Sequence, residues 1–280
     1  MHIALYAGQN AQRNELILLS IPLITALAHR VTLITPQDEA ELAHEALGQL
    51  PLIADLTVHL QTHGNTFAAA IETALQREQP DLLLIPAFTS PTTLLGWRER
   101  RRELNVLSSL PIPFLRVQGK VKPIHQIIVA SAGGEQALQS IPLVGQLARA
   151  YHATVTVLHV SSQDLVYFEG FAASPLSGED VLNLDQMTGT TLHQLVAGLQ
   201  AQGITAHLQI LNGLVEETVL AECQHYDLLV IGSHQPTPIG RPADQRWLRV
   251  IQRLSFQDVT RDLLERSPVP VLVTGKSAAQ

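Results

Sequence analysis

The sequence has little of several things, and each shortage excludes a class of protein. Its 280 residues include one cysteine, Cys223, so no disulfide can form within the chain, which suits a reducing compartment. Charged residues make up 15% of the chain and the net charge is −7. This balance argues against a nucleic-acid partner bound through a broad basic surface. Together with this low charge, a hydrophobic fraction of 46% argues against a disordered chain.

Long apolar runs and targeting signals are also missing. The longest apolar stretch, from Leu16 to Ala28, is interrupted by Ser20, Pro22 and Thr25 and is too short to span a bilayer. The N-terminus, MHIALYAG, lacks a basic flank before a long apolar core, so it is typical of a first strand and not of a signal peptide. We therefore expect a cytoplasmic protein with no membrane insertion.

Buried strands are what the sequence has in abundance. In the stretch from Tyr226 to Gly275, residues 228–231 form an apolar run without polar alternation. Such a run is typical of a strand buried on both faces of a parallel sheet. Gly232, Ser233 and His234 follow it. Because ligands of open α/β sheets bind at the carboxyl ends of the strands, we interpret these three residues as a candidate binding loop.

The same order of strands and helices occurs twice along the chain. Strands are expected at 2–7, 31–34, 55–61, 81–85 and 112–117, and again at 124–130, 154–160, 204–211, 228–231 and 269–273. Helices are expected between them at 15–29, 37–48, 66–79, 136–151, 185–202 and 215–224. Strands that alternate with helices in this way predict a parallel α/β fold.

Four sequence marks recur in the same order in both halves, which indicates a duplication. They are SIPL at 20–23 and 140–143, PDLLLIP at 80–86 with YDLLVIG at 226–232, LPIPFLRVQGK at 110–120 with SPVPVLVTGK at 267–276, and Gly64 with Gly213. The boundary falls near Lys120-Val121. We predict two repeated domains, 1–120 and 121–280, each a mostly parallel five-stranded sheet with helices on both faces.

DLLVIGSH, then a helix, then SPVPVLV resembles the carboxyl half of a universal stress protein domain. The resemblance implies an adenine nucleotide alpha hydrolase-like fold. It also implies a strand that ends in Gly-x-x-Gly and, about nine residues later, a Gly-Ser/Thr whose amides help to hold the phosphates of ATP. This sequence keeps Gly232, but Gln235 stands at the second glycine and Gln257 where the later glycine is expected. The spacing also differs, because 24 residues separate Gly232 from Gln257.

Members of this family bind adenine through an aspartate in the pattern Val-Ala-x-Asp-Gly-Ser. In this sequence Ala132 occupies the position of that aspartate. The apolar contact that the resemblance implies after the second strand of the repeat is kept at Val160. In the first half, the place near Gly8 has no carboxylate, and Pro86 replaces the strand-end glycine and offers no N–H. ATP or AMP is the cofactor implied by the resemblance, but these motifs make neither of them certain.

Single-domain members of this family dimerise through their fifth strands. The tandem arrangement therefore implies the same contact within one chain, between residues 112–117 and 269–273. Each segment carries a proline, Pro113 or Pro270, which suits the edge of a sheet better than its centre. The result would be an internal pseudo-dimer. A further homo-oligomer is left open, and no protein partner can be named.

One arginine cluster follows the fourth strand in each repeat, and each cluster lies beside one of the two tryptophans, Trp97 and Trp247. The first contains Arg98, Arg100, Arg101 and Arg102, and the second Arg246, Arg249 and Arg253. Arg246, Arg249 and Arg253 are spaced to share one helical face. They would either bind an anionic or phosphorylated ligand in place of the lost glycines, or form a solvated helix surface.

No set of residues indicates catalysis or a metal site. His159 and His234 could face one crevice, but no cysteine or carboxylate completes a ligand set by its spacing. The chain has no G-x-S-x-G motif, and Cys223 is expected to be a buried helix residue. The leading hypothesis is a non-catalytic stress-response or regulatory protein without an intact ATP-binding motif. The alternatives are an ATP- or AMP-binding member with a remodelled phosphate loop, and a regulatory module of a membrane transporter.

Overall fold

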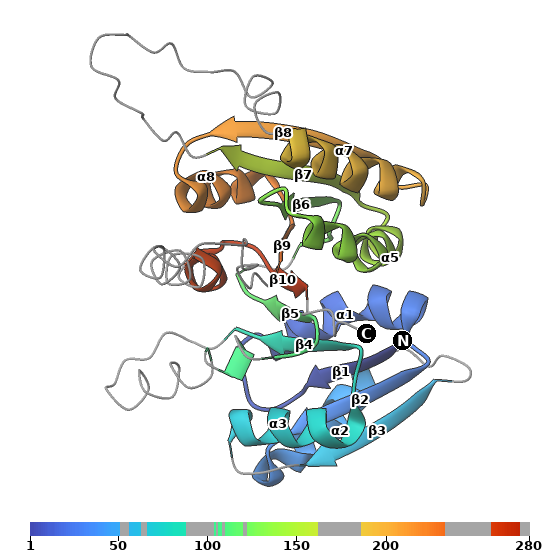
Figure 1. Cartoon of the computed structure of the whole chain (residues 1–280). Helices are drawn as coiled ribbons and strands as arrows, with labels where there is room; N and C mark the ends of the chain where they lie inside the picture. Colours follow the sequence, from blue (N-terminus) through green and yellow to red (C-terminus); the bar gives the residue numbers. More distant parts are fainter. Residues whose placement is uncertain are drawn as a thin grey trace, which may run out of the picture.

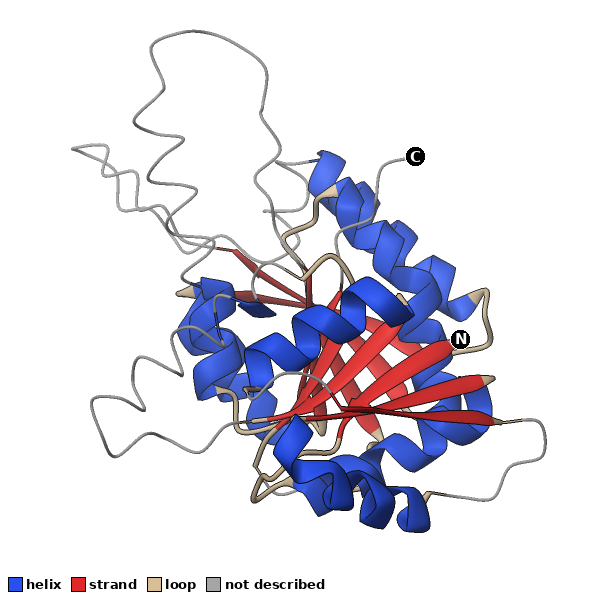
Figure 2. Ribbon diagram, turned by 90° about the horizontal axis from the view of Figure 1, so that it is seen from below, coloured by secondary structure: helices blue, strands red, loops and turns tan. Residues whose placement is uncertain are grey.

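The computed structural model describes residues 1–50, 56–62, 66–87, 104, 106–107, 110–119, 122–161, 186–232 and 259–274. They form one ten-stranded sheet with a layer of helices on each face (Figures 1 and 2). The strand order is β3-β2-β1-β4-β5-β10-β9-β6-β7-β8, which is two copies of one five-stranded order placed edge to edge. The predicted tandem α/β fold is confirmed.

The first half follows the predicted order of elements. They are β1 (His2–Tyr6), α1 (Arg13–Leu27), β2 (Arg30–Thr35), the 3-10 turn η1 (Gln37–Glu39), α2 (Ala40–Gln49), β3 (Thr57–Thr62), α3 (Phe67–Glu78), β4 (Leu82–Pro86) and β5 (Phe114–Val117). The helix expected at 37–48 begins as η1, directly after Pro36. Thr66 caps α3 by accepting a hydrogen bond from the amide of Ala69.

The second half repeats this order. Its elements are β6 (Gln126–Ala130), η2 (Glu135–Ser140), α5 (Ile141–Tyr151), β7 (Thr154–Ser161), α7 (Gln186–Gln200), β8 (Ala206–Asn212), α8 (Val215–Glu222), η3 (Cys223–His225), β9 (Leu228–Gly232) and β10 (Val271–Thr274). Residues 259–266 are also helical. Pro142 lies in the first turn of α5, where a proline is tolerated because its missing N–H has no helical partner. None of the described helices is long and apolar enough to cross a membrane.

The two halves join through antiparallel pairing of β5 and β10 (Figure 1). Leu115 lies opposite Leu272, with Arg116 opposite Val271 and Phe114 opposite Val273. The other neighbouring strands that the structure describes are parallel. The predicted pairing of the fifth strands is therefore confirmed. Two edges that would otherwise carry unpaired backbone groups become the centre of one sheet.

Both junction strands begin two residues later than the predicted segments, and a proline directly precedes each of them. The carbonyl of Pro113 accepts a hydrogen bond from Leu83 N at 3.1 Å, and that of Pro270 accepts one from Leu229 N at 3.0 Å. Proline has no N–H to donate to a second neighbour. Each proline therefore bonds to the inner strand of its own half and ends the segment that can pair across the junction.

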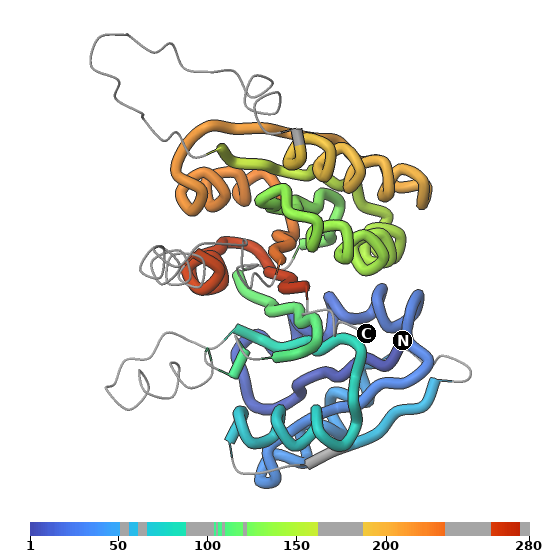
Figure 3. The backbone as a smooth tube through the Cα atoms, in the orientation of Figure 1, coloured from blue at the N-terminus to red at the C-terminus, as the bar shows by residue number. Residues whose placement is uncertain are grey.

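The hydrophobic core is continuous across the two halves. One cluster lies between the sheet and α1, α2, α5 and α7, and the other between the sheet and α3, α8 and residues 259–266. Alternate strand residues face the two clusters, as the period of two requires: Leu115 belongs to the first and Phe114 to the second. Each cluster contains residues from both halves. Figure 3 shows β5, in green, and β10, in red, side by side where the two halves meet.

Contacts shared by the repeats explain why some sequence marks recur. Asp81 accepts a hydrogen bond from His2 N at 2.7 Å, and Asp227 accepts two, from His125 N at 2.9 Å and Gln126 N at 3.0 Å. Each aspartate thus ties the start of a fourth strand to the start of the first strand beside it. The two SIPL serines also act alike, since each donates to the carbonyl three residues earlier, at 2.7 Å in Ser20 and 2.6 Å in Ser140.

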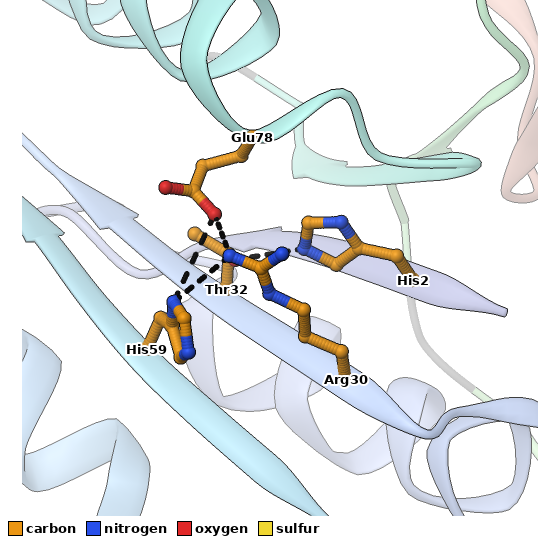
Figure 4. A network of polar contacts seen from close by, with 5 residues as sticks. All are labelled: His2, Arg30, Thr32, His59 and Glu78. Carbon is orange, nitrogen blue, oxygen red and sulfur yellow. Dashed lines mark hydrogen bonds and ion pairs between the residues drawn. The ribbon is translucent and has the colours of Figure 1, made fainter.

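A polar network found in the first half distinguishes its amino-terminal strand ends (Figure 4). His2 Nε2 lies 2.8 Å from Thr32 Oγ1, and both residues are buried. Arg30 donates a hydrogen bond to Glu78 and lies 2.9 Å from His59 Nδ1. Burial lowers the pKa of His2, and the Arg30 guanidinium lowers it further.

The second half has no such network at the matching positions. The strand registers place Gln126, Thr154 and His207 where the first half has His2, Arg30 and His59. All three second-half side chains are exposed. The charged network is therefore a property of the first half and not of the repeat.

Candidate functional site

The order of strands in each half predicts a crevice at the carboxyl ends of two strands. In the second half the chain runs outward from β6 to β7 and β8, and then returns to β9 on the other side of β6. The loops after β6 and β9 therefore leave the sheet in different directions, and ligands of open α/β sheets bind at such a point. The register places Ala130 beside Ile231 and Leu158, so Ser131, Gly232 and His159 follow at one edge.

The turn after β6 is built from small residues. Ser131 N donates to Leu158 O at 2.9 Å, and Ser131 Oγ accepts a hydrogen bond from Gly133 N at 3.1 Å. Gly133 has φ +80°, and a Cβ at this position would lie 2.3 Å from Thr188 Cγ2, so only glycine fits. Ala132 and Gly134 are exposed. A carboxylate at residue 132 would reach solvent here, but alanine offers no acceptor for an adenine edge.

His159 and Val160 lie at the carboxyl end of β7 and face opposite sides of the sheet. His159 Nδ1 is 2.9 Å from the carbonyl oxygen of Ser131. Because a carbonyl oxygen only accepts, this nitrogen carries the proton and the ring is held against the β6 turn. Val160 is half-buried and packs against the cluster that contains Leu158 and Ile231.

The structure describes only some of the predicted site residues. Gly232 ends β9, is half-buried and lies opposite Thr274 of β10. Ser233, His234, Arg246 and Arg249 lie outside the described residues, as do Trp97, Trp247 and the other arginines of both clusters. The structure therefore places Val160 and Gly232 at one strand-end edge.

The described residues carry no evidence of metal binding or of a reactive thiol. Among them, no group of three His, Cys, Asp or Glu side chains is arranged to hold a metal ion. Cys223 is buried in η3, and burial raises the pKa of its thiol to about 12. A buried neutral thiol is a poor nucleophile, which agrees with the predicted structural role.

The equivalent crevice of the first half is bridged by side chains of the chain itself. Glu39, at the end of η1, accepts a hydrogen bond from Gln9 N, directly after Gly8. Asn10 Nδ2 donates to Ala87 O at 3.2 Å and so connects the loop after β1 to the end of β4. The same Asn10 accepts a hydrogen bond from Gln12 N at 2.8 Å. Gln9 N and Ala87 O, two backbone groups near these strand ends, are therefore bonded to side chains of the first half.

The bridge corrects one inference from the sequence. The sequence has no carboxylate in the loop after β1, but the fold brings the Glu39 carboxylate to that loop from η1, which follows β2. A Cβ on Gly8 would lie 2.7 Å from Glu39 Oε2 and 2.5 Å from Tyr6 Oη. No local pattern marks this contact, because Gln9 and Glu39 are 30 residues apart.

The fold and the paired strand-end crevices define a tandem α/β protein. A model of the universal stress protein family matches residues 123–275, which is more than half of the chain, and the chain belongs to this family. The match falls on the repeat that keeps Gly232. No curated protein matches the sequence.

Solved structures resemble the chain over almost its whole length. A universal stress protein from Archaeoglobus fulgidus DSM 4304 superposes with a TM-score of 0.62 at 13% identity, over 99% of this chain and 97% of that one. A proposed universal stress protein from Pseudomonas aeruginosa UCBPP-PA14 gives 0.62 at 15% identity, over 98% and 92%. A protein of unknown function from Pseudomonas aeruginosa PAO1 gives 0.59 at 15%, with the same coverage. At these identities the likeness concerns the fold alone, and it extends over both repeats.

Proposed function

We propose that this protein is a non-catalytic regulatory member of the universal stress family, in which only the second half offers a ligand crevice. The observation that carries the proposal is the contrast between two equivalent turns. The turn after β6 has exposed small residues at 132 and 134, whereas Glu39 and Asn10 bridge the loop after β1. The first half would then serve as a fixed structural partner for the second.

The described residues do not fit an adenine nucleotide in the way that the family resemblance implies. Ala132 has no acceptor for the adenine edge, and Pro86 has no N–H for a phosphate at the end of β4. What is kept is the apolar surface of Val160 and the strand-end Gly232. If a ligand binds, we propose Val160, Gly232, Ser233 and His234 as its contacts.

Calorimetric titration with Mg·ATP and with AMP tests this proposal on the full chain. We expect no saturable heat up to about 1 mM ligand, a limit that corresponds to about −4 kcal/mol of binding free energy. Analysis of the denatured protein should release no copurified nucleotide. Protein partners would then be tested. They include membrane transporters, because one alternative function is that of a regulatory module of a transporter.

Saturable binding at one site per chain would replace this proposal with a nucleotide-binding member that has a remodelled loop. Gly134→Leu would then test whether the ligand lies over this turn, because a Cβ at Gly134 meets no atom within 4 Å and a larger side chain would occupy the open space there. Gly48→Leu is the matched control, since Gly48 also has open space but lies in α2. Arg246→Ala with Arg249→Ala would show whether these arginines hold the phosphates.

A further inference from the structure

The junction between the halves contains a buried cation from the first half. Arg116 of β5 is 3% exposed, and its Nη1 donates hydrogen bonds to Gln118 Oε1 and to the carbonyl of Leu264. Gln118, also buried, donates from Nε2 to the carbonyl of Ser267 at 2.6 Å. Leu264 and Ser267 belong to the second half and lie at the end of the helical residues 259–266. The first half thus caps a helix of the second.

This contact is chemically matched on both sides. The last carbonyls of a helix have no N–H partner within the helix and carry partial negative charge. A buried guanidinium requires acceptors, because an uncompensated buried charge is strongly unfavourable. Arg116 and Gln118 supply the donors, and the helix end supplies the acceptors. Neither group is satisfied in the same way if the halves separate.

The second half has no equivalent donor at this position with which to cap a helix of the first half. The segments Pro113-Phe114-Leu115-Arg116 and Pro270-Val271-Leu272-Val273 correspond in sequence, and Leu115 pairs with Leu272 at the centre of the junction. Val273 therefore stands at the position of Arg116 in the second repeat. It is 5% exposed within the apolar cluster and has no donor. The cap runs only from the first half to the second.

A second one-way contact lies on the other face of the sheet and runs in the opposite direction. Tyr151 Oη, in α5 of the second half, donates to the carbonyl of Leu19 in α1 at 2.8 Å. When the SIPL marks are matched, α5 continues for one turn beyond the residue that corresponds to Leu27, where α1 ends, and this turn carries Tyr151. Burial raises the pKa of Tyr151 far above its usual value, so the hydroxyl remains a donor.

We propose that Arg116, Gln118 and Tyr151 make the pairing of the halves directed, so that each half recognises the other and not a copy of itself. Two first halves joined through β5 would bring two Arg116 side chains to diagonal positions, about 7–8 Å apart at the backbone. Two second halves would leave the carbonyls of Leu264 and Ser267 without these donors. The partner that fits β5 is the β10 edge and helix end of its own chain, whether or not the crevice binds a ligand.

Hydrogen exchange on the full chain tests the first part of this proposal. Arg116→Val introduces the residue of the second repeat and leaves the Leu264 carbonyl without its cap. We expect amides of β5, β10 and residues 263–267 to exchange about tenfold faster, which is the effect of one lost buried partner. Arg30→Val is the control, because Arg30 pairs with Glu78 inside the first half. It should accelerate β1–β3 and leave the junction unchanged.

Two outcomes of this experiment would overturn the proposal. If Arg116→Val leaves exchange at the junction as in the wild type, the guanidinium does not hold the halves together. If Arg30→Val accelerates the junction as much as Arg116→Val does, the effect is one of general stability and not of pairing.

The choice of partner is tested by cutting the folded protein at a protease site inserted between residues 120 and 121. A cut sample is mixed with a cut sample of isotopically heavy protein in urea that dissociates the halves, then diluted and weighed by native mass spectrometry. We expect light and heavy halves to re-form only one-to-one pairs of a first half with a second. Like-with-like pairs, or halves that remain apart, would contradict a directed interface. Arg116→Val with Gln118→Gly and Tyr151→Phe should lose this selectivity at least tenfold.

Discussion

The two halves share one strand order but use their strand ends differently. At the carboxyl ends, the first half is bridged by Glu39 and Asn10, whereas the second has the small, exposed residues Ala132 and Gly134. At the amino ends the charged network belongs to the first half alone. The comparison shows that, after a duplication, the strand ends of the two copies can differ in their side chains while the strand order stays the same. One copy has internal polar contacts at its strand ends, while the other keeps small, exposed residues there.

What the halves have in common is what the fold itself needs. The aspartates Asp81 and Asp227 tie neighbouring strands at their starts, and Ser20 and Ser140 bond to the preceding turn in their helices. These contacts satisfy backbone groups that every copy of the fold contains. Side chains at the strand ends are free of that requirement, so they have diverged.

The largest effect should come from the glycine that shapes the second-half turn. Gly133→Ala introduces a Cβ at φ +80° that would lie 2.3 Å from Thr188 Cγ2. We expect a loss of about 2–3 kcal/mol of unfolding free energy from strain and overpacking together. Urea unfolding measures it. Gly134→Ala, where a Cβ meets nothing within 4 Å, should change the stability by less than about 0.5 kcal/mol. Equal effects would mean that the turn is not held as described.

The shared aspartates should show how far the halves are equivalent. Asp227→Ala removes two charge-assisted hydrogen bonds from a half-buried carboxylate, and we expect a cost of about 2 kcal/mol. Asp81→Ala removes one such bond from an exposed residue, with an expected cost of about 1 kcal/mol. Thermal unfolding of both variants under one condition gives the comparison. A larger loss from Asp81 would reverse this ranking.

The charged network should matter for the first half only. Arg30→Met leaves the mostly buried Glu78 carboxylate without this partner, and we expect about 1–2 kcal/mol of destabilisation, limited by the partial exposure of Arg30. Thr154→Met, at the exposed matching position of the second half, should have almost no effect. Denaturant midpoints of the two variants decide the point. Similar losses from both would remove this difference between the halves.

The smallest effect concerns pH. Because burial lowers the pKa of His2, the unfolded chain binds its proton more readily than the folded chain. His2 therefore contributes stability above its unfolded pKa of about 6.5, and this contribution is lost as the pH falls below that value. His2→Gln introduces the residue found at 126 and should flatten the fall in stability between pH 7 and 5, by at most about 1.4 kcal/mol per pH unit. Urea unfolding at three pH values tests this. An unchanged slope would place the acid sensitivity elsewhere.

Much of the fold was predictable from local patterns. Runs such as residues 228–231 are apolar without alternation because parallel strands are covered on both faces, and the recurrence of PDLLLIP as YDLLVIG exposed the duplication. The pairing of β5 with β10 was implied by the family resemblance, and the prolines before both strands agreed with a position at the edge of each half-sheet. The limits of the strands were less certain, because tertiary hydrogen bonds decide where pairing stops. The exact domain boundary, the cytoplasmic location and the roles of Arg246 and Arg249 remain predictions.

The candidate site was less predictable. Val160 and Gly232 were predicted from the family resemblance, and the structure places both at strand ends, while their role stays a prediction. Glu39 was missed, although it bonds to the loop after β1, because the contact depends on how η1 lies over that loop. Arg116 was likewise an unremarkable strand residue in the sequence, and its helix-end partner lies 148 residues away.

The sequence by itself determined the repeated α/β order and the buried strands, because both depend on residue type and short-range spacing. Only the tertiary structure decided which crevice is bridged and which half caps the other. Those contacts join groups that are distant in the chain, and hydrogen bonds form only where the fold brings a donor within about 3 Å of an acceptor.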